Sequence, residues 1–246
     1  MLRVEKKYLV PNERMDELRR RISSFVRPDI YTTNHCNIPQ YTVRSIYFDS
    51  RDFACYSEKR EGIMLRRKFR IRGYNDGGEE NRVVMEIKRK IDSRQKKYRA
   101  FVRFDDIEKL FQEGDLEKYV IENGSGTNAL EDAGKFMYHI KKGLYIPTCL
   151  VAYEREAYHG KLDSGVRVTF DKNIRSRIFP EMNTLYDDTD TKILFKNHFV
   201  IEIKYFNNGM PSWARAVVQE FRLRNDAISK YTIGVDVCKE KTITTY

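Results

Sequence analysis

Residues 63–90 read IMLRRKFRIRGYNDGGEENRVVMEIKRK, and the alternation in this stretch decides the fold. Charged and apolar side chains alternate on both sides of residues 75–81, which are rich in Gly, Asn and Asp and favour a turn. Because successive side chains of a strand point to opposite faces of a sheet, the alternation predicts two antiparallel strands joined by that turn. Arg70 and Arg72 then share one face, opposite the apolar side chains that flank them.

The same period of two recurs along the chain and predicts further strands. The expected strands are residues 2–10, 42–49, 63–74, 82–90, 95–104, 148–159, 166–171 and 199–206. Helical spacing of apolar residues predicts helices at 11–22, 105–112, 127–142 and 211–223. Residues 173–197, which include an acidic cluster at 187–190, are expected to form a long loop.

Most predicted strands carry their charges on a single face. Glu86 and Lys88 share one face of their predicted strand, as do Glu202 and Lys204. A sheet with its charged face in water explains any one such strand. When most strands show the pattern and helices are available to cover the apolar face, a closed sheet with a charged interior is favoured. We therefore expect an α+β fold: one domain over residues 1–246, an eight-stranded antiparallel β-barrel tunnel with helices packed on the outside.

The composition points to an anionic partner. The 246 residues include 46 Lys and Arg against 36 Asp and Glu, a net charge of +10 at pH 7. Nucleic acid, an anionic membrane surface and phosphorylated small molecules all remain open. The four cysteines form no Cys-x-x-Cys pair, which argues against a zinc site or a disulfide framework. No apolar run is long enough to span a membrane or to form a signal peptide. The cysteines are interpreted as reduced thiols of a cytoplasmic protein.

The charged strand faces suit phosphate chemistry. One arginine can donate to two phosphate oxygens at once, lysines act as point charges, and carboxylates hold Mg²⁺ or Mn²⁺. Neither a Gly-x-x-x-x-Gly-Lys-Ser/Thr loop nor a Gly-x-Gly-x-x-Gly motif is present. The four histidines are scattered, so nucleophilic catalysis with a histidine base has no local support. A lumen of cations would repel itself unless carboxylates, metal ions and a polyanion occupied it.

Eight short motifs occur in an order that resembles a known superfamily. They are EKKY at 5–8, SIYFD at 45–49, FRIR at 69–72, EIK at 86–88, YER at 153–155, VRVTFD at 166–171, EIK at 202–204 and SKY at 229–231. The chain resembles the triphosphate tunnel metalloenzymes from residue 3 to about 234. The branch that it most resembles is the catalytic domain of the VTC (vacuolar transporter chaperone) polyphosphate polymerases, in a short stand-alone bacterial form.

The resemblance implies an ATP:polyphosphate phosphotransferase that moves the γ-phosphate of ATP to a growing inorganic polyphosphate chain and releases ADP, with a divalent metal ion, Mn²⁺ or Mg²⁺. It implies phosphate contacts in catalysis for Arg70, Arg72, Lys88 and Lys204, and substrate binding for Lys7, Lys97, Arg155, Arg167 and Lys230. Glu202 would be the main metal ligand, with Glu86, Asp171 and Glu5 as further candidates. A one-residue register slip would put Lys96 or Arg99 in the place of Lys97.

One departure from the superfamily separates its branches. The hydrolases and cyclases begin with Glu-x-Glu-x-Lys, whereas this chain has Arg3 in the first position. A cation there weakens metal binding and strengthens polyanion binding, which favours the polymerase. A triphosphatase or polyphosphatase on the same fold is one alternative, and a non-catalytic module for polyphosphate or RNA is another. Carboxylates among the cations make nucleic acid the less favoured ligand. The resemblance also implies a separate membrane subunit, and with it a peripheral position at the inner face of a membrane.

Overall fold

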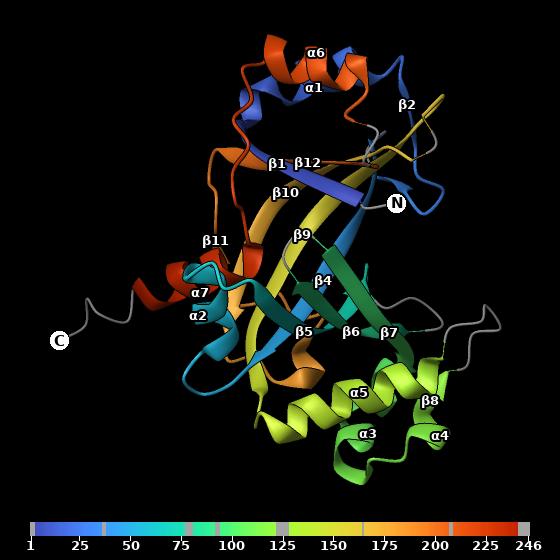
Figure 1. Cartoon of the computed structure of the whole chain (residues 1–246), viewed down its shortest axis with the longest axis vertical. Coiled ribbons are helices and arrows are strands. Elements are labelled where there is room, and N and C mark those ends of the chain that lie inside the picture. The colour runs from blue at the N-terminus through green and yellow to red at the C-terminus, as the bar shows by residue number, and fades with distance from the viewer. Residues whose placement is uncertain are drawn as a thin grey trace. The chain divides into compact units, whose positions relative to one another are not determined.

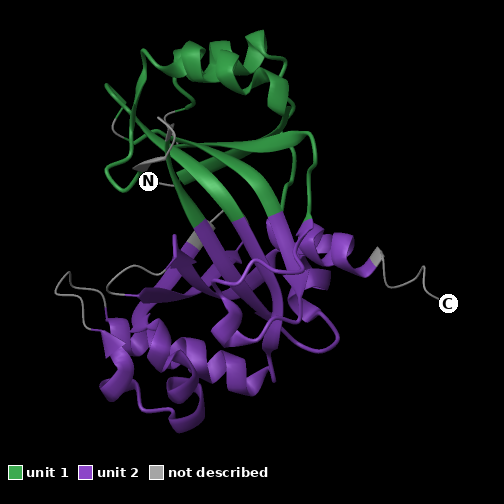
Figure 2. Ribbon diagram, turned by 180° about the vertical axis from the view of Figure 1, so that it is seen from behind, with its two compact units in different colours: residues 1–42, 153–174, 193–229 green, residues 43–152, 175–192, 230–246 purple. Residues whose placement is uncertain are grey.

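The computed structural model describes residues 3–35, 38–76, 81–91, 94–121, 128–163, 165–206 and 209–240. Most of the predicted turn at 75–81 and the first residue of the helix predicted at 127–142 lie outside these ranges. The chain forms two compact units (Figure 2). Unit 1 comprises Met1–Thr42, Tyr153–Ile174 and Ile193–Ser229, and unit 2 comprises Val43–Ala152, Arg175–Lys192 and Lys230–Tyr246. That the whole chain acts as one domain stays a prediction.

The architecture is α+β, with a large antiparallel sheet and helices (Figure 1). The sheet order is β1-β12-β10-β9-β4-β5-β6-β7-β8, with β11 beside β10, β2 beside β9 and β3 beside β4. Within the described part of the chain, this path ends at β1 and β8, which are not paired with each other. The expected closure into an eight-stranded barrel is therefore not seen in the pairing, and the sheet has additional short strands.

The predicted strands are all present. They are β1 (Arg3–Pro11), β4 (Ile38–Asp49), β5 (Leu65–Tyr74), β6 (Arg82–Ile91), β7 (Arg94–Arg103), β9 (Ile146–Gly160), β10 (Arg167–Ile178) and β12 (His198–Phe206). The sequence did not predict the short strands β2 (Val26–Pro28), β3 (Thr33–His35), β8 (Val120–Ile121) and β11 (Lys192–Ile193). Runs of two or three residues are too short for alternation to be recognised.

The prediction of a loop at 173–197 is wrong for the first six residues, which belong to β10 (Arg167–Ile178). β10 continues through Ile178, because buried Ile174 and Ser176 extend the alternation of the strand. The remainder contains the 3₁₀ turn η3 (Met182–Thr184) and the strand β11. Asp188 holds this segment to unit 2: its carboxylate accepts hydrogen bonds from Arg44 at 2.8 Å and from Arg175 at 2.6 Å. The acidic cluster is thus part of a structural ion-pair network.

All four predicted helices are confirmed, with shifted ends. They correspond to η1 (Asn12–Arg14) with α1 (Met15–Ile22), η2 (Phe104–Asp106) with α3 (Ile107–Glu113), α5 (Ala129–Lys142) and α6 (Ser212–Glu220). Three further helices were not predicted: α2 (Ala54–Arg60), α4 (Leu116–Tyr119) and α7 (Lys230–Glu240). No helix among the residues that the structure describes is both long enough and apolar enough to cross a membrane.

Each unit has a hydrophobic core on one face of its strands. In unit 1, apolar side chains of β1, β10 and β12 pack against α1 and α6, with Leu18 and Phe170 fully buried (Figure 1). In unit 2, the apolar face of β4–β7 packs against α3 and α5, with Phe69 and Phe136 at the centre. The helices therefore cover the apolar faces, as the sequence predicts. The alternate side chains of the same strands, which carry the charges, lie on the opposite faces.

Candidate functional site

The charged face of unit 1 is formed by β1, β9, β10 and β12. Cross-strand pairing places Glu5 opposite Lys204, and Glu202 between Lys7 and Thr169. Their neighbours along the strands, such as Ile201 and Ile203, are buried in the core below α1 and α6. We call this set the unit 1 face; its members are Arg3, Glu5, Lys7, Arg155, Arg167, Thr169, Asp171, Glu202 and Lys204.

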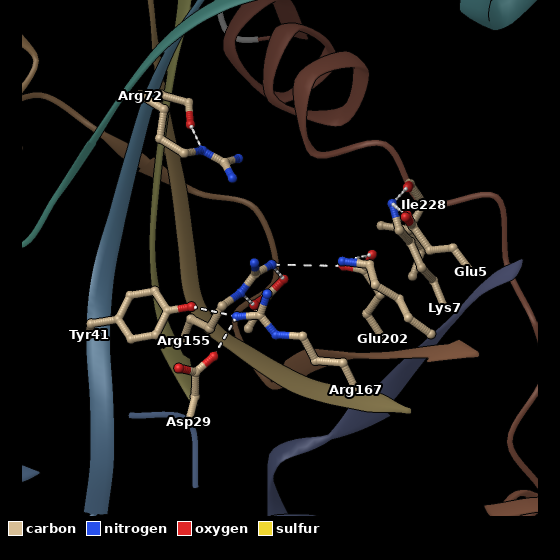
Figure 3. Close-up of polar contacts among 12 residues, drawn as sticks. Glu5, Lys7, Asp29, Tyr41, Arg72, Arg155, Arg167, Glu202 and Ile228 are labelled. Atoms are coloured by element: carbon tan, nitrogen blue, oxygen red, sulfur yellow. Dashed lines mark hydrogen bonds and ion pairs between the residues drawn. The ribbon is translucent and has the colours of Figure 1, made fainter. Parts of the chain in front are cut away.

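A buried ion pair anchors the unit 1 face. Arg155 Nε and Nη2 donate to the two carboxylate oxygens of Asp171 at 2.6 and 2.8 Å, and both side chains are buried. Burial opposes the charged form of Arg155, but Asp171 outweighs it and raises the pKa of the guanidinium. Glu202 Oε2 lies 3.8 Å from Arg155 Nη2 (Figure 3). The pair therefore fixes Arg155 beside the carboxylate expected to bind metal.

Glu202 and Glu5 each contact a lysine of the same face. Lys204 Nζ lies 2.8 Å from Glu202 Oε1, and Lys7 Nζ lies 3.0 Å from Glu5 Oε1. Lys7 Nζ also donates to the carbonyl oxygen of Ile228 at 3.1 Å (Figure 3). Burial lowers the pKa of Lys204, and Glu202 only partly offsets this. Two lysines and two carboxylates thus alternate on adjacent strands.

Arg167 is oriented by two residues that the sequence analysis missed. Its Nη2 donates to Asp29 Oδ2 at 3.0 Å and to the Tyr41 hydroxyl at 3.1 Å (Figure 3). Asp29 follows the three-residue strand β2, and Tyr41 lies just before the strand predicted at 42–49, so alternation marked neither. Arg167 Nε and Thr169 Oγ1 are buried and have no hydrogen-bond partner in the part of the chain that the structure describes.

The charged face of unit 2 is formed by β4, β5, β6 and β7. Pairing aligns Ser45 with Arg72, and Tyr47 with Arg70, Glu86 and Arg99 in one row across the four strands. The next row along the strands contains lysines from β5, β6 and β7. We call this set the unit 2 face; its members are Ser45, Tyr47, Lys68, Arg70, Arg72, Glu86, Lys88, Lys97 and Arg99.

Glu86 connects two arginines of the unit 2 face. One carboxylate oxygen accepts from Arg70 Nη2 and the other accepts from Arg99 Nε at 2.8 Å. Burial favours the neutral form of Glu86, but the charges of Arg70, Arg72 and Arg99 outweigh it and hold its pKa well below the usual range. Arg70 Nη1 also donates to the Tyr47 hydroxyl at 3.1 Å, while its Nε is buried and finds no partner within the described ranges.

Lys230 begins α7, which packs on the unit 2 face through the next residue. The Tyr231 hydroxyl donates to the buried carboxylate of Asp49, and the Tyr231 ring stacks on Tyr47 at a centroid distance of 5.1 Å. Burial acts against ionisation of Tyr47, yet its pKa is lowered by Arg70 and Arg72, with Lys230 contributing. The charge of Lys230 is therefore felt at this face, although α7 itself was not predicted.

The predicted site residues fall on these two faces, except for Lys230, which begins α7 beside the unit 2 face. On the unit 1 face lie Glu5, Lys7, Arg155, Arg167, Asp171, Glu202 and Lys204; on or beside the unit 2 face lie Arg70, Arg72, Glu86, Lys88, Lys97 and Lys230. The register places Lys97 opposite Lys88, whereas Lys96 pairs with Arg89 on the other side of the sheet. Of the alternatives to Lys97, only Arg99 shares its face.

The carboxylates differ in how well they suit a metal ion. No group of three or more His, Cys, Asp and Glu side chains within the described ranges is arranged to hold one. Both oxygens of Glu86 accept from arginines, and both oxygens of Asp171 accept from Arg155, so neither fits the role of ligand in this arrangement. Glu202 fits better, because the unpartnered hydroxyl of Thr169 is its cross-strand neighbour and divalent cations prefer oxygen ligands.

Comparisons with known proteins agree with this fold. A putative adenylyl cyclase from Hippeastrum, described as having a dominant triphosphatase activity, is 12% identical over 96% of both chains, with a TM-score of 0.50. A putative adenylate cyclase from Bacillus halodurans is 12% identical over 93% of this chain and 96% of its own, with a TM-score of 0.51. At this identity the likeness concerns the fold alone. No curated protein matches the sequence.

The family model for the VTC domain matches residues 2–239, which is nearly the whole chain. The two charged faces carry most of the motifs on which the resemblance was based, on the side of the strands opposite the hydrophobic cores. This protein therefore belongs to the VTC domain family.

Proposed function

We propose that this protein is a metal-dependent polyphosphate polymerase that transfers the γ-phosphate of ATP to a growing polyphosphate chain. The observation that carries the proposal is that two buried guanidinium donors have no partner among the described residues: Arg70 Nε on the unit 2 face and Arg167 Nε on the unit 1 face. A buried donor that remains unsatisfied costs about 1–3 kcal/mol. Phosphate oxygens would accept from both donors, and arginines bind such oxygens readily.

Each face supplies cations for the phosphate oxygens of ATP and polyphosphate. On the unit 2 face these are Arg70, Arg72, Lys88 and Lys97, with Lys230 beside it; on the unit 1 face they are Lys7, Arg155, Arg167 and Lys204. Burying Lys204 is unfavourable for its charge, as its lowered pKa shows. Such a cation is stabilised by an anionic ligand, so its burial supports a role in phosphate binding.

The reaction that fits these groups is an in-line displacement. An oxygen of the terminal phosphate of the chain attacks the γ-phosphorus of ATP and forms a new P–O bond. The bond from that phosphorus to the bridging β–γ oxygen breaks, and ADP leaves with the electron pair. Arginine and lysine side chains neutralise the charge that builds up on the transferred group. No general base is needed, because the attacking oxygen is already ionised.

Divalent metal is assigned to Glu202, with Glu5 and the Thr169 hydroxyl as further oxygen donors of the unit 1 face. When bound there, Mn²⁺ or Mg²⁺ would neutralise phosphate charge. Asp171 and Glu86 are assigned to positioning instead, because Asp171 orients Arg155 and Glu86 orients Arg70 and Arg99.

Arg3 favours the polymerase over a hydrolase. Burial lowers the pKa of Arg3, and the charge of Arg167 lowers it further. An anion bound beside Arg3 would stabilise its charge, whereas a metal ion at this position would be repelled by it. This arrangement supports binding of a longer polyanion. A separate membrane subunit, and a location at the inner face of a membrane, stay predictions from the resemblance.

The test is product analysis. Purified protein is incubated with ATP and Mn²⁺, chains are resolved on a polyphosphate-staining gel, and ADP and free phosphate are measured in parallel. A polymerase gives a ladder of long chains with ADP and little free phosphate. Free phosphate without chains would identify a hydrolase instead. Neither product, together with polyphosphate or RNA binding that survives chelation of metal, would identify a binding module.

A further inference from the structure

Three adjacent strands of unit 2 carry a large excess of positively charged side chains. β5, β6 and β7 carry five, four and five Lys and Arg side chains, against Glu86 as their single carboxylate. The register puts cations directly opposite one another, as with Arg66 and Lys90, Arg67 and Arg89, and Lys68 and Lys88. Like charges in directly opposed positions destabilise a sheet. A ligand that neutralises them would remove this cost.

Only every second row of these cations lies on the unit 2 face. Counting back from Arg70 in steps of two gives Lys68, which pairs with Lys88, and then Arg66, which pairs with Lys90. Lys97 completes the row of Lys88. The intervening pair of Arg67 and Arg89 lies on the other side of the sheet, with the apolar side chains that pack against α5.

The rows form a line that continues beyond the arginines of the proposed site. Arg66 lies four positions before Arg70 in β5, a distance of about 13 Å along the strand. The row of Arg70 contains Glu86, whereas the rows of Lys68 and Arg66 contain no carboxylate from β5, β6 or β7. The side chains of Arg66, Lys68, Lys88 and Lys90 are partly exposed, so a ligand can reach them.

We propose that Arg66, Lys68, Lys88, Lys90 and Lys97 form a chain subsite, which binds the part of a polyphosphate chain beyond the phosphates held at Arg70 and Arg72. A linear polyanion with regularly spaced charges matches a line of cation rows, whereas a single triphosphate needs only one or two of them. The proposal rests on the proposed function for the role of Arg70 and Arg72. It predicts that affinity rises with chain length, because each further row adds charge-assisted contacts.

The test compares two double variants by calorimetry, without ATP and at fixed ionic strength. The first, Arg66→Ser with Lys90→Ser, removes a cation pair from the subsite. The matched control, Arg67→Ser with Arg89→Ser, removes the adjacent pair of the same two strands from the opposite face. Tripolyphosphate and a long-chain polyphosphate serve as ligands, and the control Arg72→Ala reports on the proposed site itself.

We expect the first variant to bind the long chain about tenfold more weakly than the unaltered protein, as the loss of two charge-assisted contacts implies. Its affinity for tripolyphosphate should change less than twofold. The matched control, Arg67→Ser with Arg89→Ser, should bind both ligands as tightly as the unaltered protein. Equal losses in the two double variants would show binding by net charge alone and overturn the proposal, as would equal affinities of the unaltered protein for short and long chains.

The proposed function and the subsite fail in different ways. If Arg72→Ala leaves tripolyphosphate binding unchanged and ATP gives no chains, the proposed function is wrong. If Arg72→Ala weakens tripolyphosphate binding but the first double variant keeps its affinity for the long chain, only the subsite is wrong. Thermal melting checks that each variant is folded. A variant that unfolds is replaced by one with Gln at the same two positions, which retains more of the aliphatic stem.

Discussion

Arg155 and Asp171 form a two-point ion pair between β9 and β10, in which the carboxylate of Asp171 is inaccessible to solvent. Breaking a buried pair by removing one charge costs about 3–5 kcal/mol, because the other charge stays buried without compensation. We therefore expect Asp171→Asn to lower the free energy of unfolding by that amount, measured by urea denaturation. Asp187→Asn, at a more exposed carboxylate, is the control. Unchanged stability with lost metal binding would instead make Asp171 a metal ligand.

The depressed pKa of Glu86 makes part of the stability depend on pH. Its pKa is lower in the folded protein than in the unfolded chain, so its contribution is complete above the ordinary carboxyl pKa and is lost as pH falls toward the folded value. Glu86→Gln should therefore be less stable than the unaltered protein at pH 7, and the difference should shrink below about pH 4. Urea denaturation at several pH values measures this. A difference that does not vary with pH would contradict the charge-based role of Glu86.

Arg70 and Arg72 should respond differently to truncation. Arg70 forms a direct ion pair with buried Glu86, whereas Arg72 donates to the Ser45 hydroxyl at 3.0 Å and also acts on Glu86 through its charge. Both Arg72→Ala and Arg70→Ala should weaken tripolyphosphate binding by about 10- to 100-fold, the value of one charge-assisted contact to phosphate. Arg70→Ala should lower the melting temperature more than Arg72→Ala, because it also removes a hydrogen bond to Glu86. Lys109→Ala on α3 is the control, and a loss of folding in Arg72→Ala would show that this arginine is structural.

The alternation of side chains predicted the strands and their charged faces because both depend on local spacing. It missed α7, whose sequence KYTIGVDVCKE mixes β-branched residues with a glycine and has little amphipathic character. Gly234 allows this helix to lie close to Ser176: a Cβ there would be 3.0 Å from the serine side chain. Packing of that kind depends on residues distant in sequence. The alternation of side chains also missed α2, which follows Phe53, a residue with a left-handed backbone conformation.

The same distinction explains what could be predicted of the candidate site. Residues within motifs on long strands, such as Arg70 and Glu202, were found because their face follows from the strand period. Asp29 and Tyr41 orient Arg167 through contacts between segments more than 120 positions apart in sequence, which no local pattern reveals. The proposed division of the carboxylates into positioning groups and a metal-binding candidate also required the structure, because it depends on which oxygens already accept hydrogen bonds from arginines.

Glu202 is the carboxylate whose replacement should affect metal binding most. Glu202→Gln keeps the size of the side chain and removes its charge. Mn²⁺ should then bind the complex of the protein with tripolyphosphate at least about tenfold more weakly, because a hard cation loses a charged oxygen ligand. Electron paramagnetic resonance of free Mn²⁺ measures this without turnover. Thr169→Val, which removes the unpartnered hydroxyl beside Glu202, should have a smaller effect in the same direction. The control is Glu86→Gln, since both oxygens of Glu86 are already held by arginines; if it weakened Mn²⁺ binding as much as Glu202→Gln, the metal would have been assigned to the wrong face.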